Sequence, residues 1–98
     1  MTIIRDDRYI ENLQNMLDNI AKDSITRANT FRINLDKKIN NLPNMPFKFR
    51  QSNYYEDDNI RDLIFKGYTI PYLVDEKKEL IVVLDILNIV IERLQNKK

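Results

Sequence analysis

The sequence predicts an α+β domain in which an N-terminal strand and a helical hairpin pack on an antiparallel sheet of three to four strands. Two observations predict this fold. Apolar residues recur at three- and four-residue spacing between residues 9 and 42, and they alternate at every second position between residues 60 and 86. The first pattern is typical of amphipathic helices and the second of strands. Helices that precede a run of strands favour a sheet covered on one face by those helices.

Residues 2–5 are expected to form a short strand, and residues 8–22 the first helix. The apolar residues of this helix share one face and are Tyr9, Leu13, Met16, Leu17 and Ile20. That spacing gives the helix a single face to bury.

A second helix is expected to follow a tight turn, with Asp23 or Ser24 as its cap, because both side chains can accept a hydrogen bond from the first turn. Its apolar positions are Ile25, Ala28, Phe31, Leu35, Ile39 and Leu42. Pro43 ends the helix, since the proline ring disfavours helical conformation in the preceding residue. Two such helices form an antiparallel hairpin.

Residues 43–59 are predicted to form a structured connector, partly a strand, in which aromatic residues alternate with cations. The aromatic residues are Phe47, Phe49, Tyr54 and Tyr55. Lys48 and Arg50 can contact phosphates while the aromatic rings stack on bases. Alternatively, the rings pack beneath the connector and the cations are solvated. The acidic stretch 56–58 is interpreted as a solvated turn.

Residues 60–66 and 68–74 are predicted to pair as a hairpin with Gly67 in the turn. Alternation assigns Tyr68, Ile70, Tyr72 and Val74 to the core face and Thr69, Pro71 and Leu73 to the other. Pro71 lacks a backbone N–H, which favours a bulge or a sheet edge at that position.

Residues 80–86 are expected to form the last strand. Its alternating pattern is interpreted as Leu80, Val82, Leu84 and Ile86 inward, with Ile81, Val83 and Asp85 outward. Residues 87–94 also suit a short C-terminal helix. A single domain over residues 1–98 accommodates all these elements.

Composition excludes many enzyme classes. The chain has no Cys, no His and one Gly, so it lacks an imidazole base, the thiolate and imidazole ligands of most zinc sites and a glycine-rich phosphate loop. We therefore expect neither metal nor cofactor. The N-terminus has no apolar core of a signal peptide, and the most apolar segment, residues 80–91, is shorter than the ~20 residues of a membrane helix. A cytoplasmic protein is expected.

Residues 60–74 resemble the central hairpin of ParE/RelE-type toxins, which has an arginine, an acid, a Gly-Tyr pair and a second tyrosine. Here these are Arg61, Asp62, Gly67-Tyr68 and Tyr72, and an aliphatic strand follows. The helical hairpin that ends at Leu42-Pro43 stands in the order of the family. The resemblance covers nearly the whole chain in architecture and residues 49–87 in detail.

The resemblance implies a bacterial toxin of a type II toxin–antitoxin system, of the kind that inhibits growth and stabilises plasmids, with a cognate antitoxin as partner. RelE-like members cut messenger RNA on the ribosome, whereas ParE-like members inhibit DNA gyrase. Thr69 stands where RelE-like nucleases commonly have arginine, and residues 87–94 contain only Arg93 as a cation. These departures favour gyrase inhibition without catalysis. The alternatives are a ribosome-dependent endoribonuclease and a degenerate, harmless member that only binds antitoxin.

Three sets of candidate site residues follow. Target contacts are expected from Lys48, Arg50, Arg61 and Arg93, and a nuclease would use Lys48, Arg50, Arg61 and Lys66. Arg61 can instead pair with Asp58, Asp62 or Asp85. The antitoxin is expected on an outward apolar set formed by Leu73, Ile81, Val83, Leu87, Val90 and Leu94, unless the C-terminal helix of the chain itself covers that set.

Overall fold

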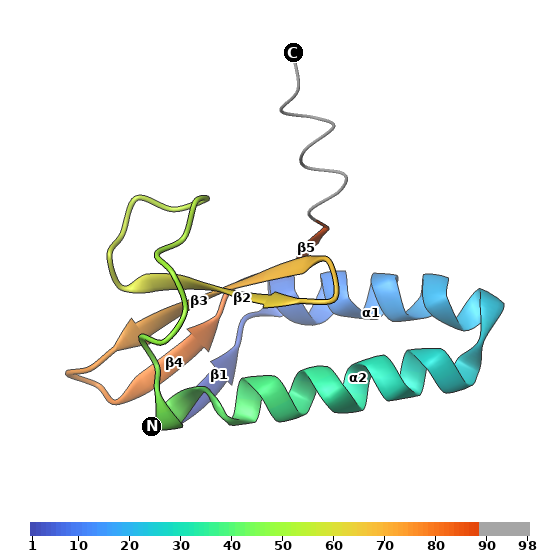
Figure 1. Cartoon of the computed structure of the whole chain (residues 1–98), viewed down its shortest axis with the longest axis horizontal. Helices are drawn as coiled ribbons and strands as arrows, with labels where there is room; N and C mark the ends of the chain where they lie inside the picture. The colour runs from blue at the N-terminus through green and yellow to red at the C-terminus, as the bar shows by residue number, and fades with distance from the viewer. Residues whose placement is uncertain (89–98) are drawn as a thin grey trace, which may run out of the picture.

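The computed structural model describes residues 1–88 as a sheet with two antiparallel helices packed on one face (Figure 1). In chain order the elements are β1 (Thr2–Arg5), α1 (Asp7–Asp23), α2 (Ile25–Asn40), a short 3-10 helix η1 (Leu42–Asn44), β2 (Ile60–Phe65), β3 (Tyr68–Asp75), β4 (Leu80–Val83) and β5 (Leu87–Asn88). The predicted fold class is confirmed. The expected C-terminal helix lies mostly outside the described residues, and Leu87 and Asn88 form a strand in its place.

The sheet is mixed. Its strand order is β1-β4-β3-β2, and β5 pairs with the other end of β3. β2, β3 and β4 are antiparallel as expected, whereas β1 runs parallel to β4, with Thr2 opposite Leu80 and Arg5 opposite Val83. The two helices form the start of the long connection that parallel strands require.

Ser24 joins the two helices. Its side-chain Oγ accepts a hydrogen bond of 3.1 Å from the Arg27 backbone N–H, and its own N–H donates to Ile20 O over 2.9 Å. One residue therefore ends α1 and begins α2, which explains the tight hairpin and identifies Ser24, of the two candidates, as the cap of α2. Ile25, expected in the core, is 70% exposed, because it is the first residue of α2 beyond this turn.

The core lies between the helical hairpin and one face of the sheet. From the helices it takes Tyr9, Leu17, Ala28, Phe31, Leu35 and Ile39. From the sheet it takes Leu63, Phe65, Ile70, Tyr72, Val74, Ile81, Val83 and Ile86. The core face predicted for β3 is confirmed, with Tyr68 packed partly buried at its end.

The face predicted for β4 is wrong. Val74 lies opposite Ile81 and Tyr72 lies opposite Val83, and directly opposed residues of an antiparallel pair share a face. Ile81 and Val83 are consequently in the core, while Leu80 and Val82 are only half-buried on the opposite side. A phase error of one residue moves every side chain of a strand to the other face.

A bulge follows β4. The β3–β4 ladder ends with Tyr72 opposite Val83, and the β3–β5 ladder begins with Thr69 opposite Leu87, so Ile70 and Pro71 face three residues. This position confirms the bulge that Pro71 predicted. The extra residue, Asp85, is buried instead of facing outward as expected.

Asp85 contacts the first helix. Its Oδ1 accepts hydrogen bonds of 2.7 Å from the Asn12 side-chain amide and of 2.7 Å from the Ile86 N–H. The bulge turns both Asp85 and Ile86 inward, which is why Ile86 is in the core even though the predicted phase of β4 is wrong.

Candidate functional site

The connector, residues 43–59, loops out at one end of the sheet (green to yellow in Figure 1) and is fixed to the core side by Arg61 and Tyr72. These two residues lie opposite each other on β2 and β3. The Tyr72 hydroxyl donates to Pro46 O over 2.7 Å, and Arg61 Nη1 donates to Phe49 O over 3.1 Å. The Arg61 guanidinium also lies 5.0 Å from the centre of the Phe47 ring.

The connector aromatics Phe47 and Phe49 pack against the core. Phe49 meets Tyr72 edge to face, with ring centroids 6.4 Å apart. These contacts fit the alternative in which the rings of Phe47 and Phe49 support the connector, whereas Tyr54 is 39% exposed. Lys48 remains exposed, with Nζ 5.2 Å from the centre of the Phe49 ring.

The opposite side of β2 holds the connector through Asp62. This carboxylate is fully buried, and its Oδ2 accepts a hydrogen bond of 3.1 Å from Asn53 N–H and lies 3.7 Å from Arg50 Nη2. Its Oδ1 has no hydrogen-bond partner among the described residues. Asp62 is one of the acids expected to pair with Arg61, but it pairs with Arg50 instead. Arg61 and Asp62 are neighbours on one strand, so their side chains point to opposite faces.

The predicted cations are only partly gathered. Lys48 and Arg50 both belong to the connector, but Arg50 lies beside Asp62 on one side of β2 and Arg61 contacts the connector from the other side. Lys66 follows the far end of β2, where its Nζ lies 5.5 Å from the centre of the Phe65 ring. With a rise of roughly 3.3 Å per residue, the backbones of Arg61 and Lys66 are roughly 17 Å apart. Arg93 lies outside the described residues. The set expected for a nuclease does not converge in the described part of the chain.

The observed orientation of β4 places the predicted antitoxin residues on two different faces of the sheet. Ile81 and Val83 are buried in the core and do not face a partner, whereas Leu73 and Leu87 are half-buried on the outer face, the side of the sheet opposite the helices. Val90 and Leu94 lie outside the described residues. The outer face also presents four apolar residues that the sequence prediction did not assign to it, namely Ile64, Leu80, Val82 and Leu84.

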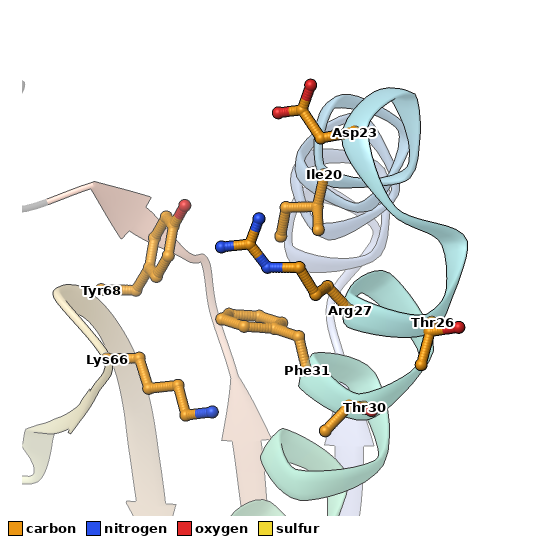
Figure 2. A pocket seen from close by; sticks show the side chains of 8 residues that line it. All are labelled: Ile20, Asp23, Thr26, Arg27, Thr30, Phe31, Lys66 and Tyr68. Atoms are coloured by element: carbon orange, nitrogen blue, oxygen red, sulfur yellow. The ribbon is translucent and has the colours of Figure 1, made fainter.

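A second surface, which we name the hairpin groove, lies between the helical hairpin and the turn that joins β2 to β3. Figure 2 shows its first cavity, about 470 Å³, into which Arg27 extends from α2 toward Tyr68 and Phe31. The lining residues are Ile20, Asp23, Thr26, Arg27, Thr30, Phe31, Lys66 and Tyr68. An adjoining cavity of about 430 Å³ shares Ile20, Asp23 and Tyr68 and adds Asn12, Met16, Asn19, Ile86 and Asn88.

The hairpin groove therefore combines an apolar floor with two cations, three amides and the carboxylate of Asp23, which lines both cavities. No sequence pattern marks this surface. Arg27 and Thr30 lie on what the helical pattern marks as an ordinary solvated face, and only the packing of α2 beside the β2–β3 turn turns them into a groove.

Burial raises the pKa of three tyrosines above its ordinary value. Burial raises the pKa of Tyr72 to about 12, and burial followed by the nearby Asp36 raises the pKa of Tyr9 to about 12. Burial, with Asp85 next in importance, also raises the pKa of Tyr55. Within residues 1–88, no three acidic side chains are grouped to hold a metal ion, and neither helix is long and apolar enough to cross a membrane.

Comparison with protein families gives a match over residues 3–88 to the model of the ParE toxin of the type II toxin–antitoxin system parDE. This match spans the helices, the connector and the whole sheet. A search of curated proteins finds no significant match.

Solved structures share the fold. The chromosomal ParDE toxin–antitoxin system from P. aeruginosa contains a chain similar to this one at 14% identity and a TM-score of 0.72, covering 91% of this chain and 96% of that one. A mutant of the E. coli toxin RelE, solved with an antitoxin RelBc peptide, is similar at 14% identity and a TM-score of 0.64, covering 89% of this chain and 81% of that one.

Proposed function

Because this chain belongs to the family of ParE toxins of type II toxin–antitoxin systems, we propose that it arrests growth by binding DNA gyrase in the cytoplasm, as a single domain over residues 1–98. Membership implies an antitoxin partner. In this proposal the toxin acts by protein–protein contact and carries out no chemistry. The alternative is cleavage of messenger RNA on the ribosome.

One observation carries the choice between the two, namely the dispersal of the cations that a nuclease would need. Cleavage requires cations beside one phosphate and a group that activates the 2′-hydroxyl. Lys66 is at the opposite end of β2 from Arg61, and Arg61 is engaged by Phe49 O. Arg50 lies against the buried Asp62 carboxylate, which would repel a phosphate. These contacts support target recognition by Lys48 and Arg50 without catalysis.

The antitoxin is proposed to bind two surfaces. On the outer face it contacts Leu73 and Leu87, together with the neighbouring exposed Ile64. In the hairpin groove, an acidic and apolar segment suits the floor formed by Ile20, Phe31 and Tyr68 and the cations beside it. An antitoxin that spans both surfaces would bury apolar area on each of them, and burial of apolar area is the main driving force for a stable complex.

The deciding experiment compares two assays on one protein. The chain is expressed alone in bacteria, growth is followed, and the purified toxin is added in excess to a gyrase supercoiling reaction. Growth arrest together with inhibited supercoiling supports the proposal. Growth arrest with supercoiling untouched refutes the gyrase mechanism.

The alternatives have their own readouts. New message ends found by primer extension during arrest, and lost in Arg50→Ala and Arg61→Ala, would establish the endoribonuclease. Unimpaired growth at high expression, with antitoxin still bound, would establish a harmless member that only binds antitoxin.

A further inference from the structure

Residues 37–55 contain four cations and no acid: Lys37, Lys38, Lys48 and Arg50. The segment is continuous in space as well, because the last turn of α2 leads through η1 into the connector. A cavity of about 100 Å³ opens between these parts. Its lining consists of Lys38, Asn41, Leu42, Asn44, Met45, Lys48 and Phe49. We name this surface the basic notch.

The basic notch has an apolar centre and a cationic rim. Met45, 62% exposed, lines it together with Leu42 and Phe49, and the cationic side chains of Lys38 and Lys48 also line it, with Lys48 Nζ 5.2 Å from the centre of the Phe49 ring. Exposed methionines are adaptable contact residues at binding surfaces. A cavity of this size takes one aliphatic side chain and is too small for a nucleobase with its sugar.

The notch is also rigid. Its connector side is held by the Tyr72 hydroxyl on Pro46 O at 2.7 Å and by Arg61 on Phe49 O at 3.1 Å. Its helix side is fixed by the Asn44 side-chain amide, which donates to Asn41 Oδ1. A surface that is already ordered loses little conformational freedom when a partner binds.

We propose that the basic notch is the surface that docks on the protein target, and that the target presents one aliphatic side chain flanked by carboxylates. This deepens the proposed function and rests on it, since the partner is the gyrase named there. The assignment adds Lys38 and Met45 to Lys48 as target contacts, because all three line the notch.

Charge favours an acidic protein over a nucleic acid as the occupant. Affinity for nucleic acid comes mainly from neutralising many phosphates, and the chain carries a net charge of only +1. A phosphate backbone offers no apolar group to pack into the pocket or against the exposed thioether. A side chain of a protein partner can bury the pocket and the thioether together.

The test uses matched pairs of variants of the full chain. Lys38→Glu is compared with Lys37→Glu, which makes the same charge change one residue away but does not line the notch. Met45→Ala is compared with Ile25→Ala, an exposed apolar residue at the far end of α2. Lys38→Gln serves as a milder variant if the charge reversal lowers solubility. The measurement is the concentration that halves gyrase supercoiling at low and at moderate salt, with antitoxin affinity as the check on folding.

Lys38→Glu is expected to raise the half-inhibitory concentration about tenfold at low salt and by less at moderate salt. Met45→Ala is expected to raise it roughly fivefold. Both control variants should stay within about twofold of the wild type, and all variants should keep their antitoxin affinity.

Three outcomes overturn the proposal, and the first two are distinct from failure of the proposed function. If the wild type inhibits gyrase but each variant matches its control, the notch is not the docking surface. If single-stranded RNA binds the wild type tightly and Lys38→Glu abolishes that binding, the partner is a nucleic acid. If the wild type leaves gyrase untouched, the proposed function itself is wrong and the assigned partner falls with it.

Discussion

Tyr72 and Tyr9 allow the same chemical change to be made in two environments. Both side chains are buried, at 0% and 1% exposure. The Tyr72 hydroxyl donates to Pro46 O over 2.7 Å, whereas the Tyr9 hydroxyl makes no hydrogen bond of ordinary geometry among the described residues and has the nearby Arg5 side chain to interact with. Replacement by phenylalanine removes one oxygen in each case, so any difference between the variants reports on the hydrogen bond.

Tyr72→Phe should cost about 1–2 kcal/mol, because the hydrogen bond is lost and the Pro46 carbonyl loses its donor. For a domain of this size each 1 kcal/mol lowers the melting temperature by about 4–8 °C. Tyr9→Phe should change the free energy of unfolding by less than about 0.5 kcal/mol, or stabilise the chain, since an unpaired buried hydroxyl is costly in the native state.

Urea and thermal unfolding at neutral pH, followed by circular dichroism, measure both variants. Amide hydrogen exchange supplies a second readout. Tyr72→Phe should raise the amide exchange rates of the connector more than those of the sheet, because the lost hydrogen bond is made to the connector. Equal losses of stability in the two variants, or a larger loss for Tyr9→Phe, would refute the assignment of the hydrogen bond as the source of the effect.

Three further predictions concern stability. Since burial raises the pKa of both tyrosines from 10.0 to about 12, stability that is fully present below pH 10 should be lost as pH rises through 12, by at most roughly 2–3 kcal/mol each; a variant with phenylalanine at both positions should lose this alkaline slope in pH-dependent urea unfolding. Ser24→Ala removes the cap of α2 and should lower the free energy of unfolding by about 1 kcal/mol, and with it the urea midpoint. An unchanged midpoint would show that the cap is dispensable. Asn12→Ala deprives the buried Asp85 carboxylate of a donor and should cost roughly 1–3 kcal/mol, whereas Asn15→Ala, on the same helix and exposed, should cost little; parity between them would contradict the role of this contact.

The helices and the β2–β3 hairpin were predictable because their determinants are local. Pro43 and Ser24 mark the ends of α2, and the apolar spacing marks its buried face. The turn between β2 and β3 has two residues with positive φ, Lys66 at 47° and Gly67 at 84°. Positive φ at both central residues gives a two-residue turn the twist of the flanking strands. The glycine alone was enough to locate it.

The face of β4 was not predictable from alternation. From Leu80 to Leu87 every residue except Asp85 is apolar, so the period of two has no contrast to set its phase. The phase is set by two non-local facts, the parallel pairing with β1 and the register against β3. The bulge at Asp85 then shifts the pattern again. Pro71 indicates that the ladder breaks but not which strand carries the extra residue.

The candidate site also contains residues whose positions follow from local sequence and residues whose positions depend on packing between distant parts of the chain. Lys48 and Arg50 are two residues apart in the connector, but their side chains have different neighbours, the Phe49 ring and the Asp62 carboxylate. Lys66 was included for its charge and type, and the length of β2 separates it from them. Arg27 and Lys38 were missed, since each joins a surface only through the packing of α2 against a distant part of the chain.

Arg61 and Asp62 help to order the connector, which also pairs with β2 through an isolated antiparallel bridge between Gln51 and Arg61, with backbone hydrogen bonds of 2.8 Å from Ser52 N–H to Ile60 O and 3.1 Å from Asp62 N–H to Arg50 O. As neighbours on one strand they project to opposite faces, and each binds a different part of the connector, at Phe49 and at Asn53. A segment held from both sides of β2 loses its freedom during folding and not on binding. Arg61 and Asp62 therefore have a structural reason to be there. The connector still exposes Met45, Lys48 and an Arg50 side chain that is 54% accessible, together with the carboxylates of residues 56–58, so its free surface offers both cationic and acidic groups to a partner.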